Sequence, residues 1–295
     1  RFNKKKLIFV LALLLIIAVI VSYSVTKIDK VKKQKEAEKL QKQEELRIEQ
    51  EKLAAQKAEE EKIEKAKQEK LKKVTTPLTE EQQNNILHIY RSTGEKRVFL
   101  TFDDGPSESV TPLILNTLKE QNVKATFFVL GGNAKRYPKL VKRAYEEGHY
   151  IANHGYSHKY SSVYSSPEAT LEEYNSTEQA IRDALGIANY SSHLFRFPGG
   201  SNGGYYDEAK QNSKALLREN GVVHLDWNCL SKDAEGAKTK EELLQNIKDT
   251  MGEKESLVIL MHDSSDKILT YEMLTELITM LKEKGYKFEN IYDLL

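Results

Sequence analysis

Apolar strand-like segments alternate with helix-forming segments from about residue 95 to residue 295, and this alternation constrains the fold more than any other feature. Strand patterns lie at residues 97–102, 125–130, 150–153, 194–197, 222–227, 257–261 and 286–290. Helix patterns lie between them at residues 112–121, 138–147, 167–185, 207–220, 240–251 and 271–284. A repeated strand-then-helix order is typical of a parallel sheet. We therefore predict an α/β fold of about seven strands, either a barrel one unit short of eight or an open doubly wound sheet.

Titratable side chains follow five of these strands at their carboxyl ends. They are Asp103 with Asp104, His154 with His158, Arg196, Asp226 with Asp233, and His262 with Asp263. In α/β barrels the loops at this edge build the active site. Titratable residues at the carboxyl ends of five strands therefore predict an active site at this edge. A binding module or a structural membrane protein would not need such a set of residues.

The composition limits what kind of metal site this edge can hold. The chain has a single cysteine, Cys229, which excludes an intramolecular disulfide framework and a multi-cysteine zinc site. Any metal must therefore be held mainly by histidine and carboxylate. The 45 basic and 44 acidic residues balance, and this balance gives no reason to expect nucleic acid as a partner.

The pair Asp103-Asp104 is predicted to lie on a tight turn. Neighbouring side chains of an extended chain point in opposite directions, so one carboxylate can bind a metal while the other faces a substrate. The alternative is a turn that uses aspartate for its backbone hydrogen bonds and is completed by Gly105 and Pro106. The pair alone does not decide between these interpretations.

His154 and His158 are four residues apart, a spacing that brings both imidazoles to one face of a helical turn. Two histidines and one carboxylate are a common ligand set for catalytic zinc, and Asp104 is available as the third ligand. Without that carboxylate, two surface histidines would be the simpler interpretation. The other histidines have no motif around them and are expected to pack or to face solvent: His88, His149, His193 and His224.

Arg196 ends the fourth strand pattern and begins the segment Arg-Phe-Pro-Gly-Gly at 196–200. Arginine is suited to hold a carboxylate in a fixed orientation, and the glycines leave backbone N–H groups that can stabilise an oxyanion. A glycine turn beside a surface arginine is the alternative interpretation.

The N-terminal segment is apolar over residues 7–25 and follows the basic residues 4–6. About 20 apolar residues can cross a bilayer as a helix, and basic residues before such a span favour a cytoplasmic N-terminus. Residues 1–26 are therefore expected to be a cytoplasmic tip and a transmembrane anchor. A cleaved signal peptide is the alternative, with 22–24 as its cleavage region, and the protein would then be secreted.

Residues 27–76 are rich in Lys, Glu, Gln and Ala, with no Gly or Pro, and their apolar residues keep no heptad register. These are strong helix formers, so we expect a solvated helical stalk about 70 Å long, which can support weak self-association. A partly disordered linker is the alternative. A connector at 77–94 and a globular domain at 95–295 complete the expected organisation.

The strand-end motifs resemble those of the polysaccharide deacetylase (NodB-like) domain of carbohydrate esterase family four. Thr-Phe-Asp-Asp-Gly at 101–105 and His-Gly-Tyr-Ser-His at 154–158 match the first two family motifs. The segment at 196–200 is similar to the third, residues 227–233 more loosely to the fourth, and residues 260–262 to the fifth. The resemblance runs from about residue 97 to residue 295.

The sequence departs from the family pattern at two positions. Gly199 stands where an aromatic residue often follows the third-motif proline, and Ala234 follows Asp233 where the family often has tryptophan. Both changes are expected to remove apolar wall from the substrate groove.

The resemblance implies a distorted (β/α) barrel and a role for each strand-end residue. Asp104, His154 and His158 would bind zinc, or cobalt or another divalent ion. Asp103 would be the general base, oriented by Arg196, and His262 the general acid, held protonated by Asp233. The Gly199 amide would bind the oxyanion, and Trp227 and Leu260 would line the pocket for the acetyl methyl group.

The implied reaction is metal-dependent removal of N-acetyl groups from a cell-wall glycan. The membrane anchor favours N-acetylglucosamine units of peptidoglycan, with the catalytic domain of a single-pass membrane protein outside the cell. Deacetylation of chitin-like or poly-N-acetylglucosamine polymers and O-acetyl xylan esterase activity are alternatives. A carbohydrate-binding module on a membrane stalk is the non-enzyme alternative.

Overall fold

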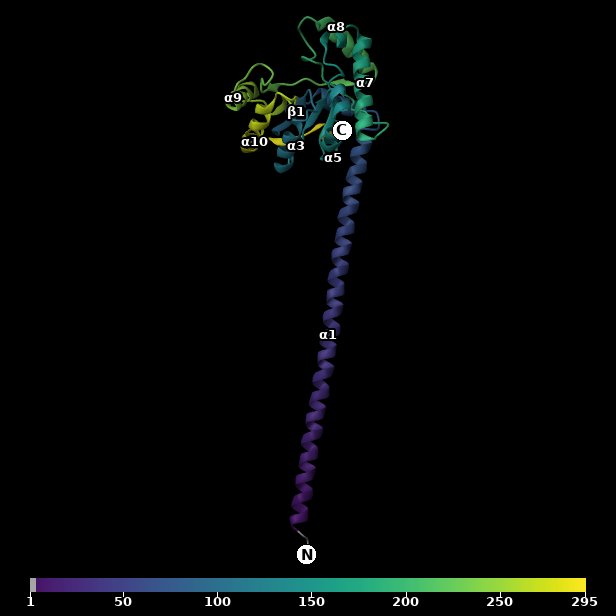
Figure 1. Cartoon of the computed structure of the whole chain (residues 1–295), viewed down its shortest axis with the longest axis vertical. Helices are drawn as coiled ribbons and strands as arrows, with labels where there is room; N and C mark the ends of the chain where they lie inside the picture. Colours follow the sequence, from purple (N-terminus) through teal and green to yellow (C-terminus); the bar gives the residue numbers. More distant parts are fainter. Residues whose placement is uncertain (1–3) are drawn as a thin grey trace. The chain divides into compact units, whose positions relative to one another are not determined.

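The computed structural model describes residues 4–295, so the first three residues of the expected cytoplasmic tip lie outside the described part. The chain divides into two compact units, one ending at Gln68 and the other spanning Glu69–Leu295. Figure 1 shows α1 (Lys4–Lys73) as one continuous helix that includes the apolar segment. None of its residues is buried. Its apolar window has a mean hydropathy of 3.0, and by length and composition the helix can cross a membrane.

The unit from Glu69 onward contains the sheet and the shorter helices. Its strands are β1 (Arg97–Asp103), β2 (Thr126–Val129), β3 (Tyr150–Asn153), β4 (Leu194–Phe195), β5 (Val223–His224), β6 (Cys229–Leu230), β7 (Ser256–His262) and β8 (Lys287–Glu289). Its helices are α2 (Glu80–Leu87), α3 (Thr111–Glu120), α4 (Gly131–Arg136), α5 (Pro138–Glu146), α6 (Tyr160–Val163), α7 (Pro167–Leu185), α8 (Asp207–Glu219), α9 (Lys240–Met251) and α10 (Ile268–Glu283), with a final 3₁₀ turn at Ile291–Leu294.

The strands form one parallel sheet in the order β5-β4-β3-β2-β1-β7-β6, and β8 pairs with the first half of β1. The expected parallel, curled barrel-like fold is confirmed. Within residues 4–295, β5 and β6 each pair on one side only, so strand pairing does not close the barrel. The buried Arg196 side chain instead crosses its interior, donating from Nε to Leu225 O at 2.9 Å and from Nη1 to Thr101 Oγ1 at 2.7 Å.

Several elements differ from the predicted ranges. The strand β6 has two residues, too few to leave a periodic pattern, and pairs with β7 through Cys229 and Ile259. The strand β4 ends at Phe195 because Pro198 cannot donate to a ladder and Gly199 turns with φ 74°. Residues 77–94 contain α2, which begins with a capping box at Thr79 and packs against the core through the buried Ile86.

The core lies on both faces of the parallel sheet, which explains why β1 and β7 read as continuous apolar runs. All six residues after Arg97 in β1 are buried. The register places Asp103, the last residue of β1, opposite His262, the last residue of β7. Neighbouring parallel strands thus bring the sequence-predicted groups to one edge of the sheet.

Candidate active site

Asp104, His154 and His158 form a cluster at the carboxyl ends of β1 and β3. Each offers one ligand atom, and these atoms lie within 4.8 Å of one another. Asp104 Oδ1 lies 3.4 Å from His154 Nε2 and 3.4 Å from His158 Nε2. Asp104 and His158 both have positive φ, at 72° and 57°, so the backbone is turned to aim these side chains inward.

The donor set fits a divalent cation. Asp104 Oδ1 is buried and has no hydrogen-bond partner in the described part of the chain, as expected of an atom that faces a metal. His154 Nδ1 lies 2.8 Å from Arg196 O, a contact that assigns the proton to Nδ1 and leaves Nε2 free as a ligand. Two imidazoles and one carboxylate are a donor set that suits a divalent cation.

The ionisation of the cluster residues bears on whether they can bind a cation. Burial alone would raise the pKa of Asp104, but the nearby imidazoles of His154 and His158 hold that pKa well below its usual range. Burial lowers the pKa of His158, and the His154 charge lowers it further. Burial alone would lower the pKa of His154 too, yet Asp103 and Asp104 raise it, so a bound metal must displace a proton there.

Asp103 is buried beside the cluster and paired with Arg196. Arg196 Nη1 donates to Asp103 Oδ1 at 2.9 Å, and Asp103 Oδ2 lies 3.8 Å from His154 Nε2. Arg196 itself is fully buried, with its guanidinium 3.9 Å from the centre of the Phe128 ring. One oxygen of Asp103 is therefore fixed by arginine, and the other faces the centre of the site.

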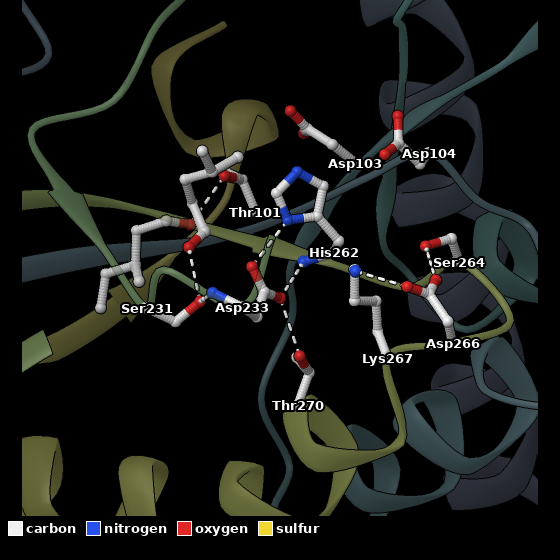
Figure 2. A network of polar contacts seen from close by, with 12 residues as sticks. Thr101, Asp103, Asp104, Ser231, Asp233, His262, Ser264, Asp266, Lys267 and Thr270 are labelled. Carbon is white, nitrogen blue, oxygen red and sulfur yellow. Dashed lines mark hydrogen bonds and ion pairs between the residues drawn. The ribbon is translucent and has the colours of Figure 1, made fainter. Parts of the chain in front are cut away.

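His262 is held by Asp233 on the other side of the site. Its Nδ1 lies 2.7 Å from Asp233 Oδ1, its backbone N–H donates to Asp233 Oδ2 at 2.8 Å, and Thr270 donates to the same oxygen at 2.7 Å. Figure 2 shows the second ring nitrogen turned toward Asp103 and Asp104. Burial alone would lower the pKa of His262, but the Asp233 hydrogen bond and charge raise it to about 9.

The Gly199-Gly200 turn lies between two aromatic rings. A Cβ on Gly199 would lie 2.5 Å from Tyr160 Oη, and a Cβ on Gly200 would lie 3.2 Å from the Trp227 ring. The space beside Gly199 is therefore occupied by Tyr160. Trp227 is half-buried, and Leu260 is buried in β7.

Other polar residues support the site: Asp226 and Asp263 were noted at strand ends but given no role, and Asn133 was not predicted. Asn133 donates to Asp104 O at 2.8 Å. Asp226 accepts from Ser201 Oγ at 2.6 Å and fixes the turn after Arg196. Asp263 is buried against Gly105, accepts from Thr111 Oγ1 at 2.6 Å, and has its pKa raised to about 7 by burial. A polar residue directly after a strand-end motif, as Asp263 is, was the only sequence signal for these roles.

Glu173 of α7 supports the histidine loop. It accepts from the backbone N–H groups of Tyr156 and Ser157 at 2.6 and 2.7 Å and from Ser157 Oγ at 2.6 Å. These three bonds shape the chain between His154 and His158, so Glu173 controls the spacing of two ligands.

Glu173→Gln is expected to weaken binding of a divalent metal about 10- to 100-fold, since outer partners of metal ligands have effects of this size. The amide can replace only part of the carboxylate's accepting capacity. Competition with a chelating dye measures the affinity. Glu172→Gln is the matched control, because Glu172 is exposed. Equal affinities of the two variants would contradict the role of Glu173.

Several known proteins are similar to this chain. The polysaccharide deacetylase family model matches residues 90–220. The peptidoglycan-N-acetylglucosamine deacetylase PgdA of Listeria monocytogenes is 37% identical over 209 residues, which cover 70% of this chain and 40% of that protein. A peptidoglycan-N-acetylglucosamine deacetylase of Bacillus cereus is 35% identical over 214 residues, covering 69% of this chain and 72% of the relative. A solved CE4 esterase from Streptococcus mutans has 31% identity and a TM-score of 0.64, covering 70% of this chain and 90% of that chain.

Proposed function

Since the chain belongs to the polysaccharide deacetylase family, we propose that it removes acetyl groups from N-acetylglucosamine units of peptidoglycan. The observation that carries this proposal is the arrangement of three groups around one point. The cluster of Asp104, His154 and His158, the Asp103–Arg196 pair and the His262–Asp233 pair all lie at the carboxyl-end edge of the sheet. Hydrolysis of an amide needs an electrophile, a base and an acid around the substrate.

Zinc is the proposed metal, held by Asp104 Oδ1, His154 Nε2 and His158 Nε2. When bound, such a cation lowers the pKa of its water toward about 7 and polarises a carbonyl group. Asp103 removes a proton from the attacking water, because Arg196 orients its carboxylate and leaves Oδ2 toward the site. The Gly199 N–H is the proposed donor to the oxyanion.

His262 is the proposed general acid. The leaving nitrogen of an amide must gain a proton before the carbon–nitrogen bond breaks, and a histidine with a pKa of about 9 carries that proton at neutral pH. Asp233 therefore acts as a positioning residue that also keeps the imidazole charged. Trp227 and Leu260 are proposed to line the acetyl pocket. An amine leaving group must be protonated, so a histidine that stays charged at neutral pH favours N-acetyl over O-acetyl substrates.

Asp233→Asn is expected to move the basic limb of the kcat/KM profile to lower pH. The active form of His262 is protonated, so activity is lost as the pH rises through its pKa. Without the carboxylate this pKa falls toward the ordinary value of about 6.5. The measurement is kcat/KM against pH for wild type and variant. Thr270→Val removes one donor to Asp233 but keeps its charge, so it should move the limb less than Asp233→Asn does. An unmoved limb would remove His262 from the acid role.

The membrane helix supports the choice of polymer. Peptidoglycan lies just outside the cell membrane, and we propose that α1 anchors the protein as a single-pass membrane protein with residues 75–295 outside. Protease added to intact protoplasts should then cut the domain. A domain that stays uncut until the membrane is opened would refute this orientation.

Acetate release from purified peptidoglycan, compared with chitooligosaccharides and acetylated xylan, tests the proposed function. The full chain should release acetate from peptidoglycan fastest and only with a divalent metal present. Faster release from chitooligosaccharides would assign a chitin-like substrate, and release from xylan alone would assign an esterase. Binding of glycan without any acetate release would favour a carbohydrate-binding module.

A further inference from the structure

A row of aromatic rings leads from the metal cluster to the surface. The His158 and Tyr160 ring centres are 5.6 Å apart, those of Tyr160 and Tyr206 are 6.3 Å apart, and those of Tyr206 and Tyr205 are 4.9 Å apart. The row therefore begins at a proposed metal ligand and continues without a gap. We call Tyr160, Tyr206 and Tyr205 the tyrosine row.

The outer end of the tyrosine row is largely exposed to solvent. Tyr205 is 94% exposed and Tyr160 is 39% exposed. A single exposed aromatic residue needs no explanation, but Tyr205 continues a row whose inner members are packed. Tyr206 also rests on Tyr164, with ring centres 5.5 Å apart, and Tyr164 Oη donates to Pro198 O at 2.7 Å. The row is thus built onto the Gly199 turn.

The loop that carries Tyr205 is held in place. Asp226 accepts from the Ser201 N–H at 3.0 Å, and Asp207 accepts from the Gly203 N–H at 2.6 Å. A loop fixed at two points presents its aromatic ring at little entropic cost on binding.

We propose that the tyrosine row binds the sugar units next to the one being deacetylated, with Tyr205 contacting the outermost unit. This rests on the proposed function, because the occupant is the glycan chain of that reaction. A β-linked pyranose presents axial C–H groups on its faces and hydroxyl groups at its edge. The tyrosine ring matches these faces with a rigid apolar surface. The row starts beside His158, so a chain whose acetamide reaches the metal cluster extends over it.

The test compares oligomers of two and five N-acetylglucosamine units on the full-length protein. In Tyr205→Ala, the ratio of kcat/KM for the pentamer to that for the dimer should fall about 5- to 30-fold, the range expected for an aromatic contact at a binding surface. Tyr205→Phe keeps the ring and should retain the wild-type ratio. An unchanged ratio in Tyr205→Ala would overturn the proposal, as would an equal loss in Tyr205→Phe.

A binding measurement separates this proposal from the proposed function. Calorimetric titration of the pentamer into the Asp103→Asn protein needs no turnover, and adding Tyr205→Ala should weaken binding by a similar factor. If the wild-type protein released no acetate from any glycan but Tyr205→Ala still weakened pentamer binding, the proposed function would fail and glycan binding by the tyrosine row would stand. If acetate were released but Tyr205→Ala left pentamer binding unchanged, only the proposal for the tyrosine row would fail.

Discussion

Alanine in place of His158 is expected to remove the metal and to abolish acetate release while the fold survives. The His158 side chain is 33% exposed and lies on a loop, so the core loses little. One of only three protein ligands is lost, and the affinity should fall by more than the roughly 100-fold that an outer-shell change can cause. His158 is the better choice for this test than His154, whose side chain is 3% exposed and packs in the core.

Metal content after gel filtration and the thermal unfolding curve together measure this prediction. His158→Asn is the conservative companion, since asparagine tolerates the left-handed backbone found here but binds zinc poorly. His88→Ala is the control, because His88 is exposed and outside the cluster. Stoichiometric metal in either His158 variant would show that the ligand assignment is wrong.

The sequence could predict where the chemistry-bearing residues meet because parallel strands share a direction. Residues that directly follow strands must then gather at one edge, whatever the details of packing. The register between β1 and β7, which places Asp103 opposite His262, sharpens this expectation but is not needed for it. The helices α7 and α9 were predicted with their observed bounds because Ser166 and Thr239 cap them locally.

The contacts that refine the site could not be predicted, because they join residues without a shared local pattern. Tyr160 reaches Gly199 from a short helix 39 positions earlier, and a glycine in a motif gives no sign of which ring will cover it. Glu173 lies near the start of α7 and accepts a hydrogen bond from the loop between His154 and His158. The strand β6 forms only because β7 offers it an edge. Tertiary packing, not propensity, decides each of these features.

Asp103→Asn is expected to retain the metal and to lose about 10²- to 10⁴-fold in turnover. Asp104 supplies the carboxylate of the metal cluster, so the change leaves the ligand set intact. An asparagine oxygen can still accept from Arg196 Nη1, which now donates to Asp103 at 2.9 Å, but the amide cannot take a proton from water. The loss corresponds to about 3–5 kcal/mol of activation free energy, the usual contribution of a general base.

The same substitution should lower stability, because it leaves the buried Arg196 charge without its counter-charge. Turnover must therefore be measured well below the midpoint of thermal unfolding of the variant. Asp104→Asn is the matched comparison, since it should lose both metal and turnover. The two variants therefore distinguish metal binding by Asp104 from proton removal by Asp103, two roles that the residue pair alone did not decide. If Asp103→Asn kept normal turnover, or if it lost the metal as Asp104→Asn does, then Asp103 would act as a ligand or a structural residue and the base would have to be sought elsewhere.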